Sequence, residues 1–205
     1  MKIEGAATYV DSNGKRHSIE GIGSLPDDTS LQSLNVAGSF SFDDISCDKV
    51  KIEGDGRGKS IVAKNISVSG SVEIDSIKVE ELFQVSGSTE ISNLSAEEII
   101  MESRGGTIGK IKCDKIKIFH SGGVSIDSNT IFSKIFGSHT SHVKTDSRVH
   151  INKLDAVKVE LQNCEVGEIK CKDAYIGSNC VIQKLIVEGE CEVAADSKVE
   201  ETIRN

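Results

Sequence analysis

The sequence lacks tryptophan and is poor in the other residues that fill broad cores. It holds two Tyr, six Phe and one Pro in 205 residues, against 19 Gly. A broad globular core normally uses bulky aromatic side chains to fill its volume. A core that must be built from Val, Ile, Leu, Ala and Cys therefore predicts a narrow and uniform interior.

Other features that the sequence lacks narrow the expected location and the expected partners. No run approaches the ~20 apolar residues of a membrane-spanning helix, and residues 1–5 lack the apolar stretch of a signal peptide, so we expect a bacterial-type cytoplasmic location. The net charge of −8 comes without a clustered basic face, which argues against nucleic acid as a partner. The six Cys include no Cys-x-x-Cys pair, and we expect them to be reduced and packed as small apolar side chains.

What the sequence does contain is a short repeat. From about Leu34 onward, units of the form apolar, any residue, apolar recur every five or six residues. Each unit places two side chains on one face of a short strand. One series shows the longer period directly, because its units recur at intervals of sixteen or seventeen positions: Ile45/Cys47, Ile61/Ala63, Ile77/Val79, Leu94/Ala96 and Ile111/Cys113.

This period predicts an all-β fold, a parallel β-solenoid with a triangular cross-section. Three short strands would form each coil of about 16–17 residues, and the coils would stack on one another. Gly38, Gly54, Gly70 and Gly87 recur at the same one-coil interval. Because glycine reaches positive φ without penalty, we expect these residues to turn a corner between two faces.

Two segments depart from the repeat. Residues 1–33 contain Ala6–Val10 and His17–Ile22 around a turn at residues 11–14, which predicts a β-hairpin followed by a linker. We interpret it as an N-terminal cap, because an uncapped solenoid end exposes unpaired edge groups. The solenoid is assigned to residues 34–200, with an irregular apolar insertion near residues 128–148.

Three features together resemble a known family. They are the Ile/Val-x-Gly-Ser repeats at one-coil spacing, the central residues 132–138 and the stretch at residues 174–180. The chain resembles the bactofilins, bacterial polymer-forming cytoskeletal proteins, and more closely their Firmicutes-type cytoplasmic relatives. The resemblance implies a right-handed triangular β-helix that polymerises end to end without nucleotide. Members of the family scaffold cell-shape, envelope or spore-related processes.

One candidate contact site stands out within the insertion. Four large apolar residues and a lysine lie within six positions: Ile131, Phe132, Lys134, Ile135 and Phe136. On a short helix the apolar residues would share one face. That face either packs back on the solenoid or contacts a peripheral membrane surface, a partner or another copy in a polymer.

The search for chemistry yields no catalytic or cofactor-binding residues. His139 and His142, with His150 one coil along, could offer ligands to a metal, but no Cys or carboxylate completes the set and a polar surface loop is the simpler interpretation. Cys164 and Cys180 should stack on adjacent coils. No Gly-rich phosphate loop is present, and residues 55–58 and 104–106 are interpreted as corner or bulge sequences.

We therefore expect a non-enzymatic scaffold that self-assembles without nucleotide or organises partner proteins. A non-polymerising interaction module like the pentapeptide-repeat proteins is the alternative, since a strict five-residue step runs from Val149 to Ile176. A hexapeptide-type acyltransferase is a further alternative, because residues 176–181 match one hexapeptide unit. Such enzymes repeat strictly by six, giving about 18 residues per coil.

Overall fold

The computed structural model describes residues 3–4, 8–10, 16–25, 29–120 and 148–204. These residues form nine strands of one sheet and no helix. The strands are β1 (Ile3–Glu4), β2 (Thr8–Val10), β3 (Arg16–Ser24), β4 (Thr29–Phe119), β5 (Val149–Leu161), β6 (Cys164–Ile176), β7 (Val181–Val187), β8 (Cys191–Val193) and β9 (Lys198–Arg204).

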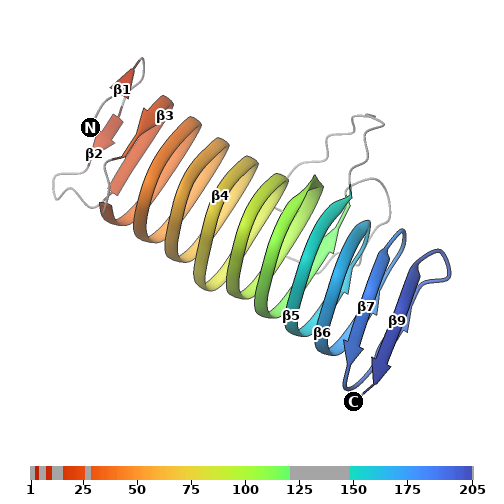
Figure 1. Cartoon of the computed structure of the whole chain (residues 1–205). Coiled ribbons are helices and arrows are strands. Elements are labelled where there is room, and N and C mark those ends of the chain that lie inside the picture. Colours follow the sequence, from red (N-terminus) through yellow and green to blue (C-terminus); the bar gives the residue numbers. More distant parts are fainter. Residues whose placement is uncertain (1–2, 5–7, 11–15, 26–28, 121–147, 205) are drawn as a thin grey trace, which may run out of the picture.

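The sheet winds into a β-solenoid of about nine turns. Figure 1 shows the turns stacked along one axis, with the N-terminal strands at one end and β9 at the other. β4 alone makes several turns, and β3 to β9 pair in parallel with their neighbours. The predicted all-β solenoid is confirmed.

The pairing register measures the coil length. Arg16 pairs with Ser33 and Val181 pairs with Lys198, an offset of seventeen positions in both cases. The offset is fifteen positions between β5 and β6 and sixteen between β6 and β7. These lengths fit three strands per coil, and they fit neither the longer coil of a strict hexapeptide array nor a four-sided pentapeptide coil.

The burial pattern of β5 shows how one coil is built. Its inward pairs are Val149 with Ile151, Leu154 with Ala156, and Val159 with Leu161, and all six side chains are buried. Two consecutive exposed residues separate each pair from the next, and these mark the corners. Because β-branched residues suit a pleated surface, the repeat forms strands and stacks them into one continuous apolar core.

The corner glycines behave as predicted. Gly38, Gly54, Gly70 and Gly87 all have positive φ, between 129° and 150°. A Cβ at Gly70 would meet the carbonyl oxygen of Gly54 in the preceding coil. The corner therefore needs glycine both for its backbone conformation and for the close approach of adjacent coils.

The prediction for residues 55–58 is wrong. Gly56 and Gly58 lie within β4 without positive φ, and Gly56 is buried. A Cβ at Gly58 would overlap the ring of Phe42, which stacks on Phe40 with ring centroids 5.0 Å apart. Gly58 therefore makes room for an aromatic ring from the preceding coil.

The N-terminal hairpin is confirmed, with β2 shorter than the predicted strand. β2 pairs antiparallel with β3, with Tyr9 opposite Ser18, and β1 pairs antiparallel with β3 at Ile22 and Gly23. The other edge of β3 pairs in parallel with β4. β3 therefore forms the first parallel rung of the solenoid, and β1 and β2 cover parts of its outer edge.

Candidate functional site

The predicted contact residues Ile131, Phe132, Lys134, Ile135 and Phe136 lie outside the described residues, as do His139 and His142. The sheet continues across this part of the sequence without losing register, because Gly106 pairs directly with Val149. Of the predicted metal ligands, only His150 is described. Among the described residues, no group of three His, Cys, Asp or Glu side chains could hold a metal ion.

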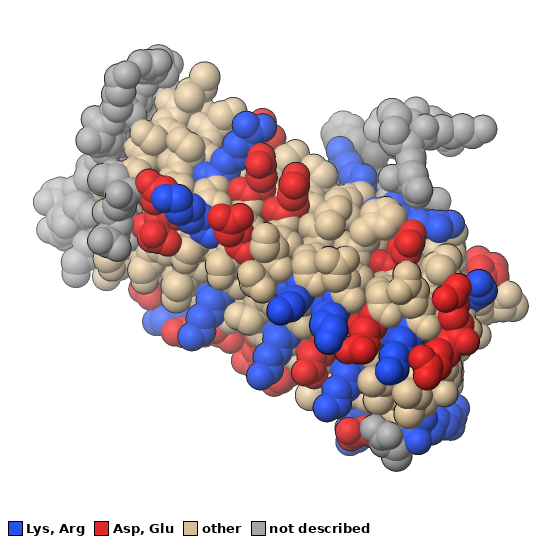
Figure 2. All heavy atoms as spheres, viewed as in Figure 1, with Lys and Arg blue, Asp and Glu red and all other residues tan. Residues whose placement is uncertain are grey.

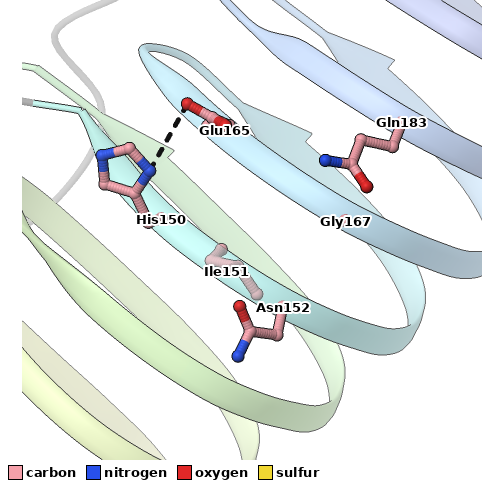
Figure 3. A pocket seen from close by; sticks show the side chains of 6 residues that line it. All are labelled: His150, Ile151, Asn152, Glu165, Gly167 and Gln183. Carbon is pink, nitrogen blue, oxygen red and sulfur yellow. Dashed lines mark ion pairs between the residues drawn. The ribbon is translucent and has the colours of Figure 1, made fainter.

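His150 lies instead beside a hollow on the side of the rod. The hollow has a volume of about 280 Å³ and is lined by His150, Ile151, Asn152, Glu165, Gly167 and Gln183. Figure 3 shows Asn152 and Gln183 on either side of Gly167, with His150 and Glu165 on adjacent turns. Because Gly167 has no side chain, a gap opens between these polar groups.

The hollow is lined mainly by polar groups, which include one His–Glu pair. His150 Nδ1 lies 3.4 Å from Glu165 Oε2, and both side chains are partly exposed to solvent. The lining contains two amides but no thiol or hydroxyl group. A Cβ at Gly167 would come within 2.7 Å of the carbonyl oxygen of Asn152, so backbone packing alone accounts for the glycine that creates the hollow.

The cysteines occupy the core, as predicted. Cys47, Cys113, Cys164, Cys171 and Cys180 are buried, whereas Cys191 is partly exposed, and all are free thiols. Cys164 and Cys180 face each other on adjacent coils, as expected from the spacing.

Burial raises the pKa of most of these thiols, whereas the hydrogen bond with Cys164 lowers the pKa of Cys180. Desolvation raises the pKa of Cys113 and of Cys171 to about 12, helped for Cys113 by the nearby Asp114 carboxylate. It also raises the pKa of Cys164. Since the thiolate is the reactive form, these side chains act as packing groups at neutral pH.

The C-terminal end of the sheet differs from the N-terminal end. β9 pairs with β7, and β8 pairs with β6, each along one edge. No strand among the described residues pairs with their other edges. Val193 on β8 is 44% exposed, although it continues the inward column of Ile176.

The inward positions of the last coil are also more polar than those before it. Thr202 and Arg204 align with Leu185 and Val187 of the preceding coil, and both are exposed. Only Val199 of β9 packs partly against the core. The sequence offered a signal for this end in the polar residues that replace the apolar pairs, but the repeat alone did not identify it as a contact surface.

The sides of the rod carry charges of both signs. Figure 2 shows Lys and Arg interspersed with Asp and Glu over one face. Several ion pairs join adjacent coils, among them Lys59 with Asp43, Lys64 with Asp48, Arg57 with Glu73 and Lys153 with Glu168. Exposed pairs of this kind each contribute little, roughly 0.2–1 kcal/mol.

Within the part of the chain that the structure describes, no helix could cross a membrane. Comparisons of the chain with protein-family models, with curated proteins and with solved structures give no match.

Proposed function

We propose that this chain is a non-catalytic structural scaffold, which associates with copies of itself through its C-terminal coil and needs no nucleotide. The observation that carries the proposal is the unpaired edge of β8 and β9 at one end of a continuous solenoid. An unpaired strand edge presents a row of N–H and C=O groups that can pair with another chain. The resemblance to bactofilins supports the same role.

The side chains at this end favour association. Val193 is 44% exposed at the edge of the core, and Cys191 and Val199 are only partly covered. A second copy would bury these groups and would give the free strand edge a backbone pairing partner. Such a junction would be stabilised both by backbone hydrogen bonds and by the burial of apolar side chains.

The two ends of the rod make different contributions. β1 and β2 already occupy parts of the outer edge of β3. Among the described residues, the strand edges that remain unpaired are those of β8 and β9. Two copies therefore join by their C-terminal ends, which makes a twofold-symmetric pair of rods. The long sides of the pair stay available for partner proteins.

The experiment compares Val193→Lys with Val62→Lys. Val62 is also exposed, at 40%, but it lies on the side of the rod. The comparison is made at roughly 500 mM salt, where contacts between surface charges are screened. There we expect the parent and Val62→Lys to form dimers in sedimentation velocity as concentration rises. Val193→Lys should stay monomeric, because a lysine at a strand edge blocks pairing. Equal self-association of all three proteins would contradict the proposal.

The alternative is a monomeric interaction module, whose rod binds partners without self-association. A parent protein that stayed a single rod at all concentrations, with and without the lysine substitution, would favour it.

A further inference from the structure

Over four successive coils, one corner of the solenoid carries charges that are separated by sign along the rod. At this corner each coil presents two consecutive outward residues, and we call the corner the charge ridge. In successive coils its residue pairs are Glu80-Glu81, Glu97-Glu98, Asp114-Lys115 and Val157-Lys158, and all eight are exposed. Two coils of carboxylates are thus followed by coils that bear lysines.

The register places these residues in adjacent coils. Gly106 lies against Thr89, and Gly109 lies against Ser92, so adjacent coils are offset by seventeen positions at this point. Lys115 therefore lies one coil beyond Glu98. In the parallel register of the strands, Lys158 lies opposite Lys115 on the following coil.

Within the described part of the chain, few groups neutralise the carboxylates of the acidic coils. Among the described residues, Glu80, Glu97 and Glu98 make no ion pair, and Glu81 accepts a hydrogen bond from the Asn65 amide at 2.8 Å. Adjacent coils lie only ~4.8 Å apart, and like charges facing each other across a sheet repel.

Among the described residues, three lysines of the next coil are likewise unpaired, whereas Lys117 of that coil and Lys158 of the following one both pair with Glu160. Lys110, Lys112 and Lys115 are exposed, and none of them makes an ion pair within the described part of the chain. Asp114 is the single carboxylate of this coil on the ridge. Coils nearer the N-terminus differ, because Asp48 there pairs with Lys64 of the next coil at 3.3 Å.

The charge ridge of one rod is complementary in charge to the ridge of a second rod that runs in the opposite direction. A second rod that runs antiparallel along the ridge would set its lysine coils against the carboxylate coils of the first. The same contact would then occur twice, related by a twofold axis. A partner of uniform charge would match only half of the ridge, so a second copy of this chain fits it best.

We propose that two copies associate side by side and antiparallel along the charge ridge. The twofold axis lies between the coil of Glu97 and the coil of Lys115. Glu97 and Glu98 of each copy face Lys112 and Lys115 of the other, and the coil of Glu80 faces the coil of Lys158. This lateral contact is separate from the C-terminal edge, so both can form in one assembly.

The test uses two charge-reversed variants, Glu97→Lys/Glu98→Lys and Lys112→Glu/Lys115→Glu. Both are made in the Val193→Lys background, so that the C-terminal contact does not contribute. We expect the background protein to form dimers at low salt in sedimentation velocity. Each reversed variant alone should dimerise at least roughly tenfold more weakly, because like charges then meet twice.

Mixing the two reversed variants gives the sharpest outcome. Each variant now carries the charges that the other needs, so the equimolar mixture should form a heterodimer. Dimerisation of the background protein should also weaken between roughly 50 and 500 mM salt, as the Debye length falls to a few ångströms. The control Lys51→Glu/Glu53→Lys only exchanges the partners of an internal ion pair, and it should dimerise like the background.

Two results would overturn the lateral contact. One is a background protein that stays monomeric at low salt. The other is a mixture of folded reversed variants, checked by circular dichroism, that forms no heterodimer. Neither result touches the C-terminal contact, which is tested by the difference between the parent and Val193→Lys.

Discussion

At the scale of single residues, the cysteines show how the core constrains chemistry. A coil has room inside for small and branched side chains, and a thiol fills such a position well. Desolvation raises the pKa of Cys113 and Cys171 to about 12. A thiol with such a pKa carries only a trace of thiolate near neutral pH.

We therefore expect Cys191 to be the first cysteine to react with a thiol reagent at pH 8. It is partly exposed, whereas the other five thiols are buried. Labelling with N-ethylmaleimide followed by mass spectrometry should show one fast site and five slow ones. In Cys191→Ser the fast site should disappear, and equal labelling of all six thiols in folded protein would refute the prediction.

At the scale of one element, the corner formed by Gly38, Gly54, Gly70 and Gly87 restricts which residues the sequence can place there. The stacked glycines at this corner bring adjacent backbones into close approach, as between Gly70 and Gly54. Further along the rod, Asn163 and Asn179 adopt positive φ at equivalent corners. Asparagine is a tolerated substitute, because its short polar side chain bonds locally, and here the Asn179 amide donates to Asn163.

Alanine at Gly70 should be far more costly than alanine at Gly56. The first change places a Cβ against the carbonyl oxygen of Gly54, at a position whose φ is 142°. We expect it to lower the free energy of unfolding by about 1–3 kcal/mol. At Gly56 the nearest atom is the flexible Cδ1 of Ile52, at 3.1 Å, so the change should stay within about 1 kcal/mol. Urea unfolding followed by circular dichroism measures both, and equal losses would refute the corner argument.

The elements divide into those that local sequence specifies and those that it does not. The apolar pairs and the corner glycines follow from sterics within a few residues, so the solenoid and its period could be predicted. The fit of Phe42 against Gly58 could not, because it depends on which residues of neighbouring coils meet. The hollow over Gly167 and the exposed Val193 are likewise consequences of stacking, and no local motif encodes them.

At the scale of the whole molecule, the rod is a one-dimensional stack in which each coil contacts only its neighbours. About nine turns at ~4.8 Å per turn give a rod roughly 43 Å long. Inner coils pair along both edges, so the ends alone offer backbone groups for assembly. The difference between the two ends therefore governs what the rod can build end to end.

The N-terminal strands should limit end-to-end assembly to two rods. β1 and β2 pair with β3 on the edge that a further coil would otherwise use. A variant lacking residues 1–15 frees that edge while leaving β3 and its parallel partner β4 in place. The C-terminal edge of one copy could then pair with β3 of the next, and each junction would leave another free edge.

We expect this deletion to convert pairs of rods into longer chains. The maximum dimension from small-angle X-ray scattering should grow with concentration beyond the roughly 90 Å of two rods of about nine turns each at ~4.8 Å per turn. The same deletion combined with Val193→Lys should remain short, because it lacks the second edge of the junction. A deletion variant that keeps its circular dichroism spectrum yet still stops at two rods would show that β1 and β2 do not limit the assembly.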